Sequence, residues 1–114
     1  GGSGFNRPTS ISAFIHFAPI SPYALITNSG NNTVLLCQVN PSTFILSNCT
    51  PTGSNFNQPS FVFEDQANQF AYITNKGNNS VTVCNDNNGV LTNCNSMPYG
   101  FNSPVSITVE NVCL

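Results

Sequence analysis

The five cysteines are the residues whose types and spacing most directly indicate chemistry in this chain. Cys37 and Cys49 are twelve positions apart, Cys84 and Cys94 are ten apart, and Cys113 stands alone near the end. Structural zinc sites use cysteines separated by about two to four residues, together with further Cys or His ligands. The single histidine of the sequence is far from every cysteine. The spacing therefore favours disulfides, and we expect neither a metal site nor a cofactor.

The two cysteine pairs are spaced as opposed residues of two β-hairpins. Each separation is even, so the two members of a pair lie equally far from the middle of a hairpin. Opposed residues of antiparallel strands have Cα atoms about 4.5–5.5 Å apart, which is within the range of a disulfide. We predict the bonds Cys37–Cys49 and Cys84–Cys94, and with them an oxidising compartment: secreted, periplasmic or cell-surface. Cys113 is then either a buried thiol or the partner of a cysteine in another chain or another part of this one.

No set of residues indicates catalysis. His16 lies in "FIHFAP", and no serine occupies the G-x-S-x-G motif that would accompany it in a hydrolase. Glu64 and Asp65 are adjacent, so on a strand they would point to opposite faces, and "EDQANQ" indicates a solvated turn. Asp86 begins "DNNG", which lacks the pattern of a calcium loop and indicates a hairpin turn. We expect no catalytic residue and a protein that is not an enzyme.

The composition excludes several partners. Only 5% of the 114 residues are charged, against roughly 25% in an ordinary domain, and the net charge is −2. Such a chain has no field with which to attract nucleic acid, and no apolar run is long enough to span a membrane. Three Asn residues, Asn31, Asn48 and Asn78, fit the acceptor pattern for N-linked glycosylation.

The sequence is built from a repeat of about 45 to 51 residues. "FN.P" occurs at 5–8, 56–59 and 101–104, and "ITN.GNN[TS]V" occurs at 26–34 and 73–81. Each copy closes with one of the cysteine pairs. The repeat predicts units at residues 1–50 and 51–95, and the start of a third at 96–114. The aromatic residues of the first motif, Phe5, Phe56 and Phe101, are predicted to pack between neighbouring units.

Each unit contains four strand-like runs, and none has helical periodicity. They are rich in Val, Ile, Phe, Tyr and Thr, and clusters of Asn, Gly and Pro separate them. In the first unit they lie near 10–17, 24–27, 33–39 and 44–49, and in the second at 60–63, 70–74, 80–84 and 90–94. A ninth run, Val105–Val109, is left without partners, and its alternate residues Val105, Ile107 and Val109 are candidates for pairing with another subunit.

These motifs resemble the YVTN-type β-propeller repeat in its cysteine-containing form. The resemblance covers both full units and the start of the third. It implies that each unit is a four-stranded antiparallel blade, with "FN.P" leading into the innermost strand. A propeller closes with about four to eight blades, whereas this chain holds about two and a quarter. We therefore predict an all-β, propeller-like fold that is incomplete in one chain and is completed by other copies or by missing sequence.

The incomplete array leads to three expectations of function. Two blades leave apolar faces uncovered, so the first is a non-enzymatic extracellular structural or binding module that self-assembles by blade stacking and strand pairing. The second is a subunit of an open surface filament, which is the non-closing form of the same assembly. The third, permitted by the resemblance, is a fragment of a lactonase-like propeller enzyme. Expected partners are copies of the chain or the rest of a longer propeller, and a glycan or a surface protein.

Overall fold

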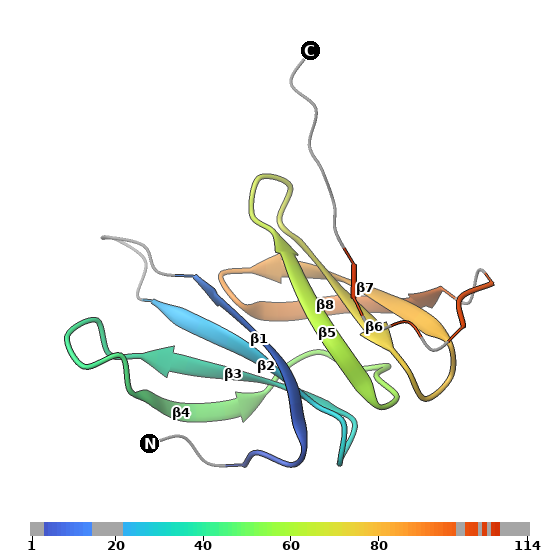
Figure 1. Cartoon of the computed structure of the whole chain (residues 1–114). Helices are drawn as coiled ribbons and strands as arrows, with labels where there is room; N and C mark the ends of the chain where they lie inside the picture. Colours follow the sequence, from blue (N-terminus) through green and yellow to red (C-terminus); the bar gives the residue numbers. More distant parts are fainter. Residues whose placement is uncertain (1–3, 15–21, 98–99, 103, 105, 108–114) are drawn as a thin grey trace.

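The computed structural model describes residues 4–14, 22–97, 100–102, 104, 106 and 107. Over these residues the protein is all-β, with two antiparallel four-stranded sheets and no helix (Figure 1). In both sheets the strands lie side by side in chain order, as a meander. Sheet 1 consists of β1 (Pro8–Phe14), β2 (Tyr23–Asn28), β3 (Thr33–Val39) and β4 (Leu46–Pro51). Sheet 2 consists of β5 (Pro59–Asp65), β6 (Phe70–Asn75), β7 (Ser80–Asn87) and β8 (Val90–Met97).

The eight strands are those that the sequence predicts, with different ends. β3 has the predicted bounds, whereas β5, β7 and β8 continue two or three residues further than their apolar runs. They continue because backbone pairing does not require an apolar side chain, as in the pairs Asp86–Leu91 and Asn87–Val90 of the last hairpin. Within the ninth predicted run, residues 106 and 107 are described and are not in a strand; Val105 and Val109 lie outside the described residues.

The abundance of Asn has a conformational cause. Ten of the described non-glycine residues have positive φ; six of them are Asn, and three of these six, Asn32, Asn79 and Asn88, are in turns. Asn adopts the left-handed region more readily than other non-glycine residues. The β7–β8 hairpin turns on Asn88 and Gly89, whose φ angles are 52° and 90°. Two successive residues with positive φ form the two-residue turn that matches the twist of a hairpin.

Each disulfide lies at a β-bulge. Cys37 bonds to Cys49 with a Cα–Cα distance of 4.0 Å, and Cys84 bonds to Cys94 with a distance of 4.1 Å. The register of β3 with β4 shifts by one residue between Leu36 and Gln38, and that of β7 with β8 shifts between Val83 and Asn85. Asn48 and Asn93, with φ of 52° and 50°, precede the second cysteine of each pair. A residue with positive φ is a common means of forming such a bulge.

Two buried amides hold the start of each sheet to one of its turns. Asn28 Oδ1 accepts a hydrogen bond from the backbone of Asn6 (3.2 Å), and Asn75 Oδ1 accepts the equivalent bond from Asn57 (3.1 Å). Both Asn28 and Asn75 are fully buried. The repeated "FN.P" and "ITN.G" motifs thus meet in space, and the side chain of the second motif satisfies a backbone group of the first.

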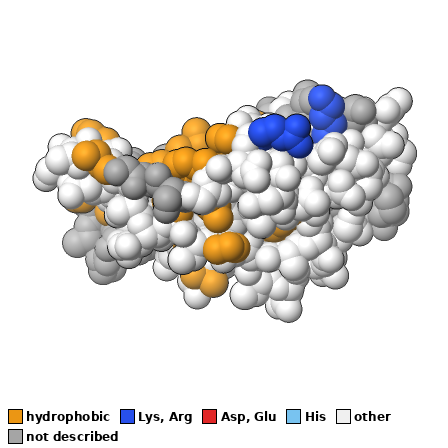
Figure 2. Space-filling view, turned by 90° about the horizontal axis from the view of Figure 1, so that it is seen from below, with side chains coloured by type: hydrophobic (Ala, Val, Ile, Leu, Met, Phe, Trp, Pro, Cys, Tyr) orange, Lys and Arg blue, Asp and Glu red, His pale blue; other side chains and the backbone are white. Residues whose placement is uncertain are grey.

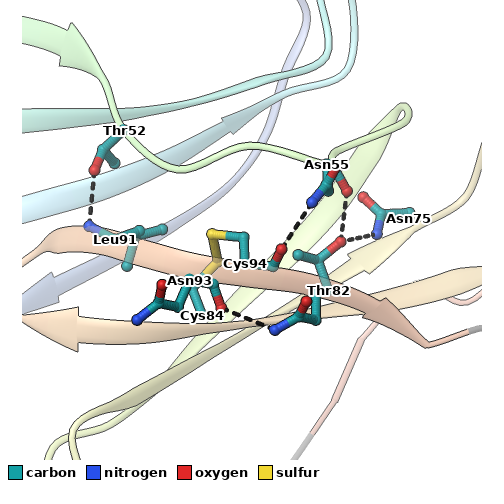
Figure 3. The surroundings of a disulfide bond; sticks show 9 residues. Thr52, Asn55, Asn75, Thr82, Cys84, Leu91, Asn93 and Cys94 are labelled. Carbon is teal, nitrogen blue, oxygen red and sulfur yellow. Dashed lines mark hydrogen bonds between the residues drawn. A yellow bond between two sulfur atoms is a disulfide. The ribbon is translucent and has the colours of Figure 1, made fainter.

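The segment between the sheets is fixed along β8. Thr52 Oγ1 accepts a hydrogen bond from the backbone of Leu91 (2.8 Å), and Asn55 Nδ2 donates to the carbonyl of Cys94 (2.7 Å) (Figure 3). The carbonyl of Asn55 accepts a bond from Thr82 Oγ1 at 2.6 Å. These three bonds place the connection beside the Cys84–Cys94 disulfide and orient sheet 2 relative to sheet 1.

Candidate functional site

The contact between the two sheets is the best-formed interface of the molecule. Its buried residues are Tyr23, Leu25 and Val34 of sheet 1 and Val62, Ala71, Ile73, Cys84, Leu91 and Cys94 of sheet 2. The residues of sheet 2 lie on the side that carries its cysteines, and those of sheet 1 lie on the side that does not. We call the side of each sheet that carries its cysteines the disulfide face, and the other side the opposite face. Sheet 2 therefore places its disulfide face on the opposite face of sheet 1.

The repeat makes the outer side of sheet 1 equivalent to the inner side of sheet 2. Ala24, Ile26 and Cys37 on the disulfide face of sheet 1 correspond in sequence to Ala71, Ile73 and Cys84, which pack between the sheets. Leu46 and Cys49 likewise correspond to Leu91 and Cys94. The chain thus presents a second copy of the surface that it already uses to bind a neighbouring sheet.

A hydrogen bond at the start of the sheets repeats between equivalent residues of the motifs. Thr9 Oγ1 donates to the carbonyl of Pro59 at 2.7 Å, and Ser60 Oγ donates to the carbonyl of Pro104 at 2.8 Å. Thr9 and Ser60 each follow the proline of an "FN.P" motif, and each acceptor is the proline of the next motif. The start of the third unit therefore approaches sheet 2 as the start of sheet 2 approaches sheet 1.

Both outer faces present apolar side chains. At the disulfide face of sheet 1, a hollow of about 360 Å³ is lined by Phe5, Pro8, Ile11 and Ile26, with Thr9 and Ser10 at its side. Ile11 is 56% exposed and Phe5 is 41% exposed. In Figure 2, hydrophobic side chains gather over the half of the molecule that holds sheet 1. On the opposite face of sheet 2, Tyr72 and Val83 are half-buried.

A polar cluster lies at one end of the inter-sheet contact. Glu64 in β5 accepts hydrogen bonds from Ser12 Oγ in β1 (3.0 Å) and from Tyr23 Oη in β2 (2.8 Å). Gln66 Nε2 donates to Tyr23 Oη at 3.0 Å. The Asp86 side chain in β7 is buried and is hydrogen-bonded to Glu64. One carboxyl group thus joins elements of both sheets.

The environment of Glu64 favours its neutral form. Burial between the sheets, followed by the hydrogen bond and the charge of Asp86, raises the pKa of Glu64 to about 8 from an ordinary value of 4.5. Burial also raises the pKa of Tyr23. The raised pKa means that the buried Glu64 carboxyl holds its proton more tightly than an exposed one does. Because Glu64 bonds to residues of sheet 1, its protonation is coupled to the contact between the sheets.

The interpretation of "EDQANQ" as a solvated turn is wrong for its first two residues. Glu64 and Asp65 are the last residues of β5, and only the following residues form the turn. Asp65 is 4% exposed and accepts hydrogen bonds from the backbone and the amide of Asn68. Glu64 and Asp65 do point to opposite faces, because they are successive residues of a strand.

Asp86 is also a strand residue. It is 5% exposed near the end of β7, and its Oδ1 accepts a hydrogen bond from the backbone of Gly89 at 2.8 Å. The hairpin turn predicted for "DNNG" is present, and Asp86 supports it from the strand. The cluster is not part of the repeat, since Ala13 and Val39 occupy the positions in sheet 1 that correspond to Glu64 and Asp86.

The structure places the other predicted site residues as follows. Both predicted disulfides, Cys37–Cys49 and Cys84–Cys94, are present. Phe56 is half-buried against the core between the sheets, whereas Phe5 and Phe101 are exposed by 41% and 38%. Ile107 is half-buried. Cys113, His16, Val105 and Val109 lie outside the described residues.

The three candidate glycosylation sites are all exposed. Asn31 and Asn78 lie in the β2–β3 and β6–β7 turns, and Asn48 lies at the bulge of β4. The hydroxyl of Thr33 donates to Asn31 Oδ1 at 2.7 Å, and that of Ser80 donates to Asn78 Oδ1 at 2.6 Å. Glycosylation of these residues remains a prediction.

Sequence reasoning missed the Glu64 cluster. One signal was present: in β5, Glu64 shares its side with Val62, two residues earlier, and Val62 belongs to the inter-sheet core. A carboxyl group in phase with core residues is expected to be buried. Tyr23 and Ser12 come from a different sheet, so their approach to Glu64 had no signal in the local sequence.

Comparison with protein-family models, with curated proteins and with solved structures found no match. Among the described residues, no three His, Cys, Asp or Glu side chains gather where they could hold a metal ion. The same part of the chain has no helix that is long and apolar enough to cross a membrane.

Proposed function

We propose that this protein is a non-enzymatic structural and binding module in which four-stranded blades stack face to face and take up further units of the same repeat. One observation carries the proposal. The disulfide face of sheet 1 is the sequence equivalent of the surface with which sheet 2 binds its neighbour. A surface that already packs on a sheet once in the chain is suited to do so again.

The proposed contact joins two different surfaces. The disulfide face of sheet 1 in one copy covers the opposite face of sheet 2 in another, with Ile11 on the first surface and Val83 on the second. Burial of exposed apolar area stabilises such a contact by about 25 cal/mol per Å² before the entropy of association is subtracted. Because the contact is heterologous, it produces a ring where the rotation closes and a filament where it does not.

The setting of this module is proposed to be extracellular or cell-surface. Two disulfides in 114 residues are characteristic of an oxidising compartment, and a chain in which only 5% of the residues are charged depends on neutral polar groups for its hydration. Glycans and surface proteins are the proposed partners of the exposed amide-rich turns.

A pair of substitutions tests the stacking. Ile11→Asp places a charge on the disulfide face of sheet 1, and Val83→Asp places one on the opposite face of sheet 2. We expect the wild-type chain to form particles larger than a monomer in light scattering coupled to size exclusion, and each variant alone to be monomeric. An equimolar mixture of the two variants should form a 1:1 complex, because one intact pair of surfaces remains.

Ala67→Asp is the matched control, because Ala67 is an exposed residue of the β5–β6 turn and lies on neither sheet face. This variant should assemble like the wild type, and circular dichroism should show the same strand content in all three variants. A wild-type chain that is monomeric up to millimolar concentration, with or without reductant, would contradict stacking between copies. Negative-stain images of the wild-type particles distinguish rings from filaments.

A further inference from the structure

The two basic side chains of the sequence line the same hollow. The sequence contains one Arg and one Lys, and both Arg7 and Lys76 border a depression of about 190 Å³ between the two sheets. Figure 2 shows their side chains next to each other on one edge of the molecule. Residues 69 positions apart have no local reason to meet, so the fold itself gathers the positive charge of this chain.

Hydrogen bonds hold the backbone of both basic residues. Arg7 precedes β1, and its carbonyl accepts hydrogen bonds from the backbone and the hydroxyl of Ser29 at 3.0 Å each. Lys76 begins the β6–β7 turn, and its backbone donates to the carbonyl of Gln58 at 3.1 Å. The starts of β1 and β5 and the turns after β2 and β6 lie at the same lower end of the molecule (Figure 1). The hollow is therefore formed where the two sheets begin.

Among the described residues, no carboxylate lies beside the two basic side chains. Within the described ranges, neither Arg7 nor Lys76 forms an ion pair. Glu64 and Asp65 are at the far end of β5, about 17–20 Å from Pro59 in the hollow at about 3.3 Å per residue. Asp86 is bound to Glu64 at that far end. The described charges are thus separated along the sheets, with cations at one end and acids at the other.

We propose that this hollow binds a single oxyanion group, a sulfate or a carboxylate, carried on a glycan. The guanidinium of Arg7 and the ammonium of Lys76 supply the charge. The hydroxyls of Thr9, Ser29 and Ser60 line the depression but already donate to backbone carbonyls. The proposed anion is therefore bound by the two basic side chains. Asn31 and Asn78 are exposed on the same two turns as Ser29 and Lys76, and the Nδ2 group of an exposed amide can donate to a sugar hydroxyl. Two cations are too few for the counterion release that drives binding to nucleic acid.

The repeat supplies substitutions that the fold already accepts. Gln58 corresponds to Arg7 and has nearly the same backbone conformation, with φ of 47° against 46°. Ser29 corresponds to Lys76. Arg7→Gln and Lys76→Ser therefore remove one charge each without changing the backbone, and Arg7→Lys retains the charge as a matched control. Circular dichroism and melting temperature should be unchanged in all three variants.

Binding is measured by calorimetry with a chondroitin sulfate tetrasaccharide, its desulfated analogue and inorganic sulfate, at constant ionic strength. We expect the sulfated sugar to bind. Each single charge removal should weaken it about fivefold, consistent with an exposed charge contact, and the double variant should lose binding. The desulfated sugar tests the carboxylate alone. Inorganic sulfate should bind more weakly than the sulfated sugar at the same residues.

Three outcomes decide the proposal. Binding of the sulfated sugar that is lost in the double variant and retained in Arg7→Lys supports it. Binding of inorganic sulfate with equal strength keeps the anion site and overturns the assignment to a glycan. Equal binding of the sulfated sugar by the wild type and the double variant, or no binding by either, overturns the site. None of these results depends on whether copies of the chain stack.

Discussion

Tyr23 in β2 donates a hydrogen bond to Glu64 in β5 over 2.8 Å, and this bond joins two sheets whose sequences otherwise repeat each other. Glu64 and Asp86 have no counterparts in sheet 1, where Ala13 and Val39 occupy their positions. The residues that repeat between the two units build the four-stranded sheets, whereas the Glu64 cluster occurs at the contact between sheet 1 and sheet 2. A polar cluster that is present once can specify which sheet lies against which.

The raised pKa of Glu64 predicts that stability falls as pH rises. The folded-state pKa of about 8 exceeds the ordinary value of 4.5, so the folded protein binds this proton more tightly than the unfolded chain. The resulting stabilisation is complete below about pH 4.5 and is lost as pH rises through about 8. The melting temperature of the wild type should therefore decline across this interval.

Glu64→Gln should remove most of that decline, because the amide stays neutral and keeps hydrogen-bonding capacity toward Ser12 and Tyr23. Thermal melts of both proteins from pH 4.5 to 8.5 measure the effect. His16→Gln is the control, since a histidine titrates in the same interval. Parallel pH profiles for the wild type and Glu64→Gln would contradict the assignment.

Asn75→Ala should destabilise the fold by about 2–4 kcal/mol. The fully buried Asn75 side chain accepts from the backbone of Asn57 and donates to Ser80 Oγ (3.2 Å) and Thr82 Oγ1 (2.7 Å). Asn28→Ala is the matched change in sheet 1. Within the described part of the chain this amide bonds to Asn6 and Thr33, which are more exposed than the partners of Asn75. We expect urea denaturation to show that Asn28→Ala lowers the free energy of unfolding by about half as much as Asn75→Ala does. A larger loss for Asn28→Ala would be inconsistent with this count of bonds.

Gly89→Ala should cost about 2–4 kcal/mol, the sum of backbone strain and overpacking. The φ angle of Gly89 is +90°, and a Cβ there would lie 2.5 Å from Leu36 Cδ1 and 2.9 Å from the Tyr23 ring. Gly100 has a similar φ of +76° with no atom within 4 Å of an added Cβ, so Gly100→Ala isolates the strain, at about 1–2 kcal/mol. Equal losses in the two variants would show that the hairpin is not tightly packed on sheet 1.

Removing the Cys84–Cys94 disulfide should destabilise the protein more than removing Cys37–Cys49. The two loops span 10 and 12 residues, so the loop-entropy contribution is about 3 kcal/mol in each case. The sulfurs of Cys84 and Cys94 also fill the core between the sheets, and their loss leaves a void there. Denaturation of the two double Cys→Ala variants should differ by about 1 kcal/mol. An equal loss of unfolding free energy in the two variants would mean that neighbouring side chains repack to fill the space left by Cys84 and Cys94.

Local signals were sufficient to predict the blades. Repeat spacing and β-branched runs are visible within one unit, and they predict the strands and turns. The predicted pairing of Cys37 with Cys49 is correct, but a β-bulge in the register, and not direct opposition about the middle of the hairpin, brings the two cysteines together. The strand ends were less predictable, because β5, β7 and β8 continue through polar residues wherever a backbone partner is present.

The sites were harder to predict, because they form between units. Glu64 meets Tyr23, which is 41 positions away, and Arg7 meets Lys76 across both sheets. A single Glu and a single Arg form no periodic pattern in the sequence, so their contacts with residues of the other sheet cannot be inferred from it. Only the stacking of one sheet on the next brings them together.

The unlike faces described above give the stacked sheets a polarity. One end of any such array terminates in a disulfide face and the other end does not, so no two-fold axis can relate the ends. A soluble single blade engineered to keep only one of its two sides adhesive would cap one terminus and leave the other free. Capping of this kind would regulate length from a chosen direction, as it does in any directional polymer.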